Sequence, residues 1–84
     1  MKLEELMLVG AVRYALGIRS NIVEKTCDFV ASVKGELSQE CIDIIIGDIE
    51  VELLLRRRIS THRSHPRDER NWLKLLEVLK EEMT

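Results

Sequence analysis

Apolar residues crowd the middle of the chain, where residues 37–58 read LSQECIDIIIGDIEVELLLRRR. If this segment is a helix with 3.6 residues per turn, aliphatic side chains line one of its faces. A second aliphatic stripe lies on a different side of the same helix. Acidic residues between the stripes leave only a narrow polar strip. A helix that is apolar around most of its surface is expected to be buried on more than one side. The first face comprises Ile42, Ile45, Ile46, Ile49 and Leu53, and the second stripe comprises Ile44, Val51 and Leu55.

The same segment has some strand character, because DIEVELLL alternates for a few residues and isoleucine and valine favour strands. Three observations favour a helix over residues 38–57. Ser38 is a good N-cap, and Glu40 and Arg56–Arg58 match the two ends of the helix dipole. The run is also longer than ordinary strands. Gly47 costs about 1 kcal/mol relative to alanine inside a helix, and it allows another helix to approach closely.

Two more helices are predicted before the central one. Residues 2–16 hold the apolar run LMLVGAV after two glutamates, and Gly17 is expected to end this helix. Residues 20–34 form the next, with Ser20 as its N-cap and Gly35 at its end. The short link to the central helix predicts that these two helices are neighbours. The apolar face of the second helix is Ile22, Thr26, Phe29, Val30 and Val33, with Val23 and Cys27 beside it.

A fourth helix, over residues 68–83, shows the cleanest amphipathic pattern in the chain. Asp68 is read as its N-cap and Trp72 as its anchor in the core. Pro66 blocks any helical continuation from the preceding segment, so residues 58–67 are read as a basic loop. The apolar positions are Trp72, Leu76, Leu79 and Met83 at a/d spacing, with Leu73, Leu75 and Val78 beside them.

The expected fold is therefore all-α, a compact bundle of about four helices in a single domain over residues 1–84. A chain of this length buries only about 60–65% of its unfolded surface, so the two-sided apolar helices predict a homodimer. The first and third helices would supply the contact. The predicted dimer interface is Ile44, Val51 and Leu55 with Met7.

The net charge, the cysteines and the length of the apolar runs bear on the class of partner and on the cellular location. The net charge of -2 argues for no class of partner. Cys27 and Cys41 lie within helical patterns and are read as small buried apolar residues. The N-terminal residues lack the pattern of a signal peptide, and no apolar run reaches the roughly 20 residues that span a bilayer. The cytoplasm is the expected location.

Positive charge is concentrated between the third and fourth helices, where RRRISTHRSHPRDER holds six arginines and two histidines. These cations could meet an acidic protein surface or contact the phosphates of nucleic acid. They could also form a solvated loop whose first arginines cap the third helix. No aromatic side chain lies among them, which weakens a stacking platform for single strands. The predicted partner-binding residues are Arg56, Arg57, Arg58, Arg63, Arg67 and Arg70.

Catalytic and metal-binding patterns find little support. His62 and His65 have H-x-x-H spacing, but both cysteines are distant in sequence and neighbouring arginines repel a cation. The acids of the third helix are read as its solvated strip, and no known catalytic motif is present. We therefore expect no enzyme, no metal and no cofactor. A small ligand held near Arg13, Tyr14 and Trp72 is a further alternative, whereas a helix-turn-helix is disfavoured because the third helix is too apolar and acidic.

Three stretches resemble small uncharacterised proteins of bacteriophages and prophages. AVRYALGIRSNIV, at residues 11–23, is similar to a pattern that reads A-V-R-Y-A-L-G-R, then serine or threonine, then Tyr-Ile. GDIE at residues 47–50 and DERNWLKLLEVL at residues 68–79 resemble later parts of such proteins. Ile18 and Asn21 depart from the pattern, where arginine and tyrosine are often found.

The resemblance implies a class of function. It implies a non-catalytic accessory protein, in the cytoplasm of an infected or lysogenic bacterium, that binds a host or phage protein and modulates or inhibits it. A component of a CRISPR or other anti-phage defence system is one such target. The alternative is a regulatory protein that binds nucleic acid through the arginine-rich residues 56–70.

Overall fold

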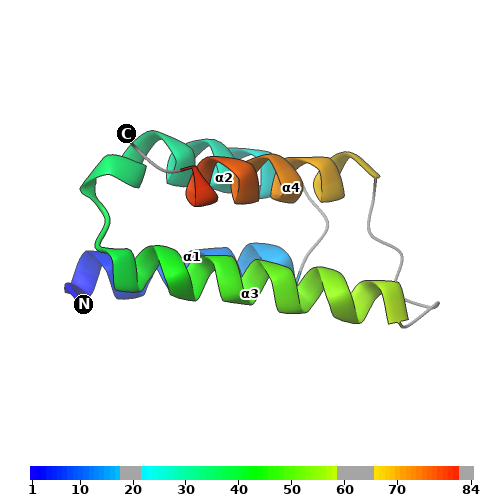
Figure 1. Cartoon of the computed structure of the whole chain (residues 1–84), viewed down its shortest axis with the longest axis horizontal. Coiled ribbons are helices and arrows are strands. Elements are labelled where there is room, and N and C mark those ends of the chain that lie inside the picture. The colour runs from blue at the N-terminus through cyan, green and yellow to red at the C-terminus, as the bar shows by residue number, and fades with distance from the viewer. Residues whose placement is uncertain (18–21, 59–65, 82–84) are drawn as a thin grey trace.

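The chain folds into four α-helices and a short 3-10 helix in the computed structural model (Figure 1). The structure describes residues 1–17, 22–58 and 66–81, and for residues 56–58, 66 and 67 it describes the backbone alone. The prediction of an all-α bundle of four helices is confirmed, and the central segment is a helix rather than a strand. The elements are α1 (Leu3–Leu16), α2 (Ile22–Val33), η1 (Lys34–Glu36), α3 (Gln39–Arg58) and α4 (Pro66–Lys80).

The helices form two layers, with α1 beside α3 in one layer and α2 beside α4 in the other (Figure 1). Within each layer the two helices run parallel, and the layers run antiparallel to each other. The predicted pairing of the second and third helices is wrong, because α2 packs mainly on α4 and α1. Since η1 carries the chain from one layer to the other, a short link joins two helices at diagonal corners of the bundle.

The core between the layers is aliphatic around one aromatic ring. Trp72 of α4 has no exposed surface, so it anchors that helix as predicted. The main face predicted for the third helix is also buried, with Cys41 added to it and Ile46 partly covered. Buried core residues are Leu8, Val9, Val12, Ala15 and Leu16 of α1, Val23, Cys27 and Val30 of α2, Cys41, Ile42, Ile45, Ile49 and Leu53 of α3, and Trp72, Leu75, Leu76 and Leu79 of α4.

The ends of α2 and α4 differ from the sequence prediction. Helix α4 begins at Pro66 and ends at Lys80, so Asp68 lies in its first turn and is not its N-cap. Proline suits the first position of a helix, where its missing N–H would have no partner and its φ is already helical. The proline read as a barrier therefore starts the helix, and Arg67 belongs to α4 rather than to a loop. Gly35, predicted to end the second helix, lies inside η1.

Lys34 connects η1 to the C-terminal end of α4. Its Nζ donates hydrogen bonds to the backbone carbonyl oxygens of Val78 and, over 2.9 Å, Glu81. The last carbonyls of a helix have no partners within it and carry the negative end of its dipole. The lysine therefore satisfies the end of α4 and ties the crossing between the layers to the last helix.

Candidate binding surfaces

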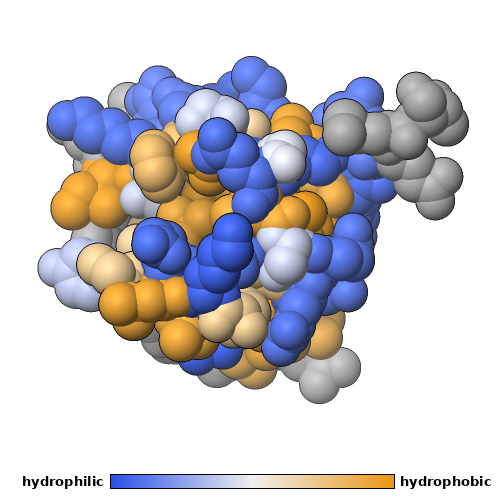
Figure 2. Space-filling model, turned by 90° about the vertical axis from the view of Figure 1, so that its left-hand side faces the viewer, coloured by the Kyte–Doolittle hydropathy of each residue, from blue (hydrophilic) through white to orange (hydrophobic). Residues whose placement is uncertain are grey.

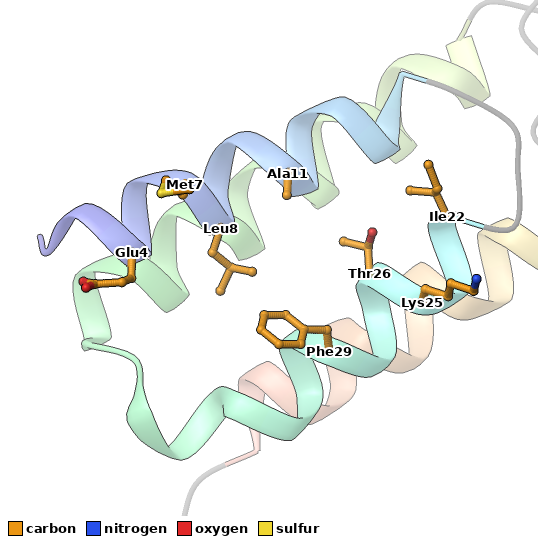
Figure 3. Close-up of a pocket in the computed structure, with 8 residues that line it drawn as sticks. All are labelled: Glu4, Met7, Leu8, Ala11, Ile22, Lys25, Thr26 and Phe29. Atoms are coloured by element: carbon orange, nitrogen blue, oxygen red, sulfur yellow. The ribbon is translucent and has the colours of Figure 1, made fainter.

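A groove lies between α1 and α2 on the outside of the bundle, with a volume of about 470 Å³. Its wall is apolar except near its two ends, and Figure 3 shows Leu8, Thr26 and Phe29 directed into the space between the helices. The rim carries two large exposed apolar side chains, Met7 at 68% exposure and Phe29 at 57%. We call this site the α1/α2 groove. It is lined by Glu4, Met7, Leu8, Ala11, Ile22, Lys25, Thr26 and Phe29.

The groove exists because the apolar positions of α2 divide between two directions. The sequence predicted one face that included Ile22, Phe29 and Val30, but only Val30 among these three is buried. Val23 and Cys27, read as flanking residues, point into the core instead. Because α2 packs mainly on α4, the side of α2 that carries Val23, Cys27 and Val30 is buried in the core. Ile22, Thr26 and Phe29 lie on the adjacent side and face α1 across the groove.

Helix α1 is likewise covered by its own chain on one side only. The prediction that its apolar run is buried on more than one side is wrong for the chain alone, because Leu6 and Met7 are both more than half exposed. Leu3 and Tyr14 are exposed as well. Figure 2 looks onto the end of the bundle where α1 begins, and hydrophobic side chains in orange gather along its left and lower edges. Apolar surface of α1 therefore reaches solvent at Leu3, Leu6 and Met7.

A second exposed apolar area occupies the C-terminal half of α3. Val51, Leu54 and Leu55 are 57%, 51% and 46% exposed. Leu54 and Leu55 follow Val51 by three and four residues, so each of them neighbours Val51 on the helix surface. We call these three residues the α3 patch. It leads along the same helix into the arginines at residues 56–58.

The four residues predicted for a dimer interface do not form one surface. Met7 lines the α1/α2 groove, whereas Val51 lines a different hollow between α1 and α3 together with Arg13 and Gly47. Ile44 is only partly exposed and packs against the core. Leu55 belongs to the α3 patch. Periodicity found the apolar stripe of α3, but it did not show that Met7 turns toward α2.

Five of the six predicted partner-binding arginines lie in helices that meet at one end of the bundle. Arg56–Arg58 form the last turn of α3, and Arg67 and Arg70 lie in the first two turns of α4. Figure 1 shows the last turn of α3 and the first turns of α4 at the same end of the bundle, opposite the start of α1. The side chain of Arg70 is exposed. Arg63, like His62 and His65, lies outside the described residues.

An ion pair crosses the surface between α1 and α3. The Nε of Arg13 donates to Oδ2 of Asp48 over 2.7 Å, and this contact raises the pKa of the guanidinium. The Arg13 side chain is exposed, yet it has a partner on α3. The hollow bordered by the α3 patch is therefore already crossed by a satisfied pair of charges, unlike the α1/α2 groove.

Glu5 is the one strongly perturbed carboxylate in the described part of the chain. It is buried between the N-terminal ends of α1 and α3, and its Oε2 accepts hydrogen bonds from both the backbone N–H and the hydroxyl of Ser38, over 2.8 and 2.7 Å. The backbone N–H of Lys2 donates to Oε1. These donors lower the pKa of Glu5 to about 2, with the Ser38 N–H as the largest cause. The buried thiol of Cys41 also interacts with Glu5, and this negative charge adds to the effect of burial in raising the pKa of that thiol.

The cysteines and the potential metal ligands among the described residues also lack the features of a reactive site. Burial raises the pKa of the Cys27 thiol to about 12 and also raises that of Cys41, so neither sulfur is a ready nucleophile. Within residues 1–17, 22–58 and 66–81, no group of three or more potential ligands is placed to hold a metal ion. A ligand site of Arg13, Tyr14 and Trp72 is not assembled, because Trp72 is fully buried and Tyr14 is 63% exposed.

Within the described part of the chain, none of the helices combines the length and apolar character needed to cross a bilayer. The chain matches no family model, no curated protein and no solved structure in the comparisons.

Proposed function

We propose that this chain is a small non-catalytic binding protein that modulates or inhibits a partner protein. The observation that carries the proposal is the α3 patch, where three large apolar side chains are about half exposed on one helix surface. Monomeric proteins seldom leave such clusters uncovered unless they bind something. The arginines that follow in the same helix suit a protein interface, because arginine is enriched at interfaces relative to the rest of the protein surface.

The charge distribution supports an acidic partner surface. The chain as a whole carries a net charge of -2, yet five arginines lie in the helical turns that meet at one end of the bundle. A partner with an apolar centre and an acidic rim would bury the α3 patch and pair with these cations. The resemblance to small bacteriophage proteins suggests a host protein, including a component of an anti-phage defence system, in the cytoplasm of an infected bacterium.

Nucleic acid is the second candidate, because the same arginines could contact phosphates. The two candidates make different use of the α3 patch. Exposed leucine and valine side chains contribute to a protein interface, but they contribute little to binding that depends on phosphate contacts. Variants of the patch and of the arginines therefore distinguish the two functions.

The test compares two variants with a matched control. Val51→Ser/Leu55→Ser removes apolar area, Arg56→Ala/Arg57→Ala/Arg58→Ala removes charge, and Leu73→Ser alters an exposed leucine of α4 that is 40% exposed. Each tagged protein is incubated with nuclease-treated bacterial extract, bound proteins are identified by mass spectrometry, and the best match is purified for calorimetry. A protein partner should bind the wild type and the control, and both other variants should bind it at least tenfold more weakly.

The same proteins are then tested in a gel shift with duplex DNA and with single-stranded RNA. If nucleic acid is the partner, binding weakens steeply as salt rises. It is then lost in the arginine variant and kept in the variant of the α3 patch. Absence of any patch-dependent protein partner, with or without a gel shift, contradicts the proposed function.

A further inference from the structure

We propose that the α1/α2 groove binds a second copy of this chain, in a dimer with twofold symmetry. The proposal does not depend on the α3 patch or on the identity of any other partner. It begins from the composition of the groove, whose lining is apolar along the middle, with Met7 and Phe29 exposed on its rim. A short chain with this much apolar surface on one side gains by burying it against another protein.

The two charged residues of the groove identify the occupant. Glu4 of α1 lies at one end, and Lys25 of α2 lies at the other (Figure 3). Both side chains are exposed, and neither belongs to the ion pairs recorded among the described residues, which are Arg13–Asp48 and Lys80–Glu50. The groove therefore carries opposite charges at opposite ends and an apolar wall between them.

This pattern is complementary to itself. A twofold axis that lies across the groove and bisects the line from Glu4 to Lys25 exchanges the two ends. The Glu4 of each copy then faces the Lys25 of the other, and the two apolar walls meet between these pairs. A twofold interface uses the same surface on both subunits, so it requires a surface whose charges complement themselves in this way. A foreign helix would require no such relationship between the two ends.

The structure also separates this interface from the α3 patch. The hollow beside the patch is crossed by the Arg13–Asp48 pair, so these two charges are matched within one chain. The charges of the α1/α2 groove have no such match, and a second copy supplies it at both ends at once. The predicted interface residue Met7 belongs to this groove.

The experiment measures the oligomeric state by sedimentation over a concentration range of about 1–100 μM at low salt. Glu4→Lys and Lys25→Glu each place like charges opposite one another at both ends of the dimer. Each single variant should weaken the dimer by about tenfold, since exposed pairs contribute little individually but occur twice. The double variant Glu4→Lys/Lys25→Glu restores opposite charges and should return the dissociation constant to within about threefold of the wild type.

A second pair of variants locates the interface. Phe29→Asp should give a monomer, whereas Val51→Asp, with the same 57% exposure on α3, should leave the dimer unchanged. Circular dichroism checks that each variant is helical, and the charge variants provide the test if Phe29→Asp does not fold. A wild-type monomer at 100 μM overturns the proposal. So does a dimer that Val51→Asp dissociates, or a double charge variant that is no tighter than the single ones.

Discussion

One carboxylate oxygen of Glu5 accepts two hydrogen bonds from Ser38, one from its backbone N–H over 2.8 Å and one from its hydroxyl over 2.7 Å. Glu5 belongs to the first turn of α1, and Ser38 is the N-cap of α3, where its hydroxyl oxygen also accepts a bond from the N–H of Cys41 over 3.2 Å. Because α1 and α3 run parallel, the positive ends of both helix dipoles lie beside this carboxylate. A single negative charge thus stabilises two helix ends that are 33 residues apart in the sequence.

Replacing Glu5 with glutamine should lower the melting temperature near neutral pH, because an amide carries no charge for the two helix ends. The pKa of Glu5 is lowered from 4.5 to about 2 in the folded state. Its contribution to stability is therefore complete above about pH 4.5 and is lost as the pH falls toward 2. Thermal melts across this range should show the gap between the wild type and Glu5→Gln closing at low pH.

The matched control for this experiment is Glu77→Gln, which alters an exposed carboxylate of α4. We expect its melting temperature to stay close to that of the wild type at every pH, because exposed charges contribute little. A constant gap between Glu5→Gln and the wild type down to pH 2 would show that the charge of Glu5 is not what stabilises the contact.

Ser38→Ala should destabilise the fold by about 1 kcal/mol, equivalent to about 4–8 °C in melting temperature. The variant loses both the N-cap of α3 and one donor to Glu5. Ser38→Thr keeps the hydroxyl and should retain most of the stability. Ser32→Ala is the control, since the Ser32 hydroxyl donates only to the Phe29 carbonyl one turn earlier in α2, and its cost should stay under about 0.5 kcal/mol.

Lys34→Met keeps the aliphatic stem of the lysine but removes the ammonium group that binds the carbonyls at the end of α4. A loss of about 0.5–1 kcal/mol is expected. The effect should be local, so hydrogen exchange should quicken in the last turn of α4 more than in α1. Lys74→Met, which alters an exposed lysine on the same helix, should leave these exchange rates unchanged. Equal acceleration in both variants would contradict the role of Lys34.

Both thiols should resist alkylation in the folded protein. Cys27 and Cys41 are 6% and 0% exposed, and burial is the first cause of the raised pKa of each. For Cys27 the rise from 9.0 to about 12 cuts the thiolate fraction at pH 8 about a thousandfold. Labelling with iodoacetamide at pH 8 should be slow until guanidinium unfolds the chain. Fast labelling of the native protein at either cysteine would show that the packing around that sulfur opens readily.

Helix positions and the core of α3 and α4 could be predicted from the sequence because each depends on local pattern. Ser38 was predicted as an N-cap, and its hydroxyl occupies that position. Trp72 was predicted as an anchor and is fully buried. These residues act within one helix, or on the nearest apolar surface, so a periodicity of 3.6 residues is enough to identify them.

The arrangement of the helices could not be predicted, because it depends on contacts between distant segments. Periodicity placed Ile22 and Phe29 on the apolar face of α2 and Val23 and Cys27 beside it, whereas the structure buries the latter two and exposes the former. Phe29 is 57% exposed because α2 packs mainly on α4, a helix that begins more than 30 residues later. The role of Glu5 was missed for the same reason. Its sequence context predicted only a favourable charge in the first turn of α1, and its partner Ser38 lies on another helix.

The parallel course of α1 and α3 also affects how the protein can be immobilised for binding measurements. Helix α1 begins and α4 ends on the same side of the bundle, whereas the turns that carry Arg56–Arg58 and Arg70 lie at the far side (Figure 1). A tether attached at either terminus would therefore leave the arginine-bearing end pointing away from a sensor surface or bead. Immobilised protein can then present that end to large partners without steric obstruction by the support.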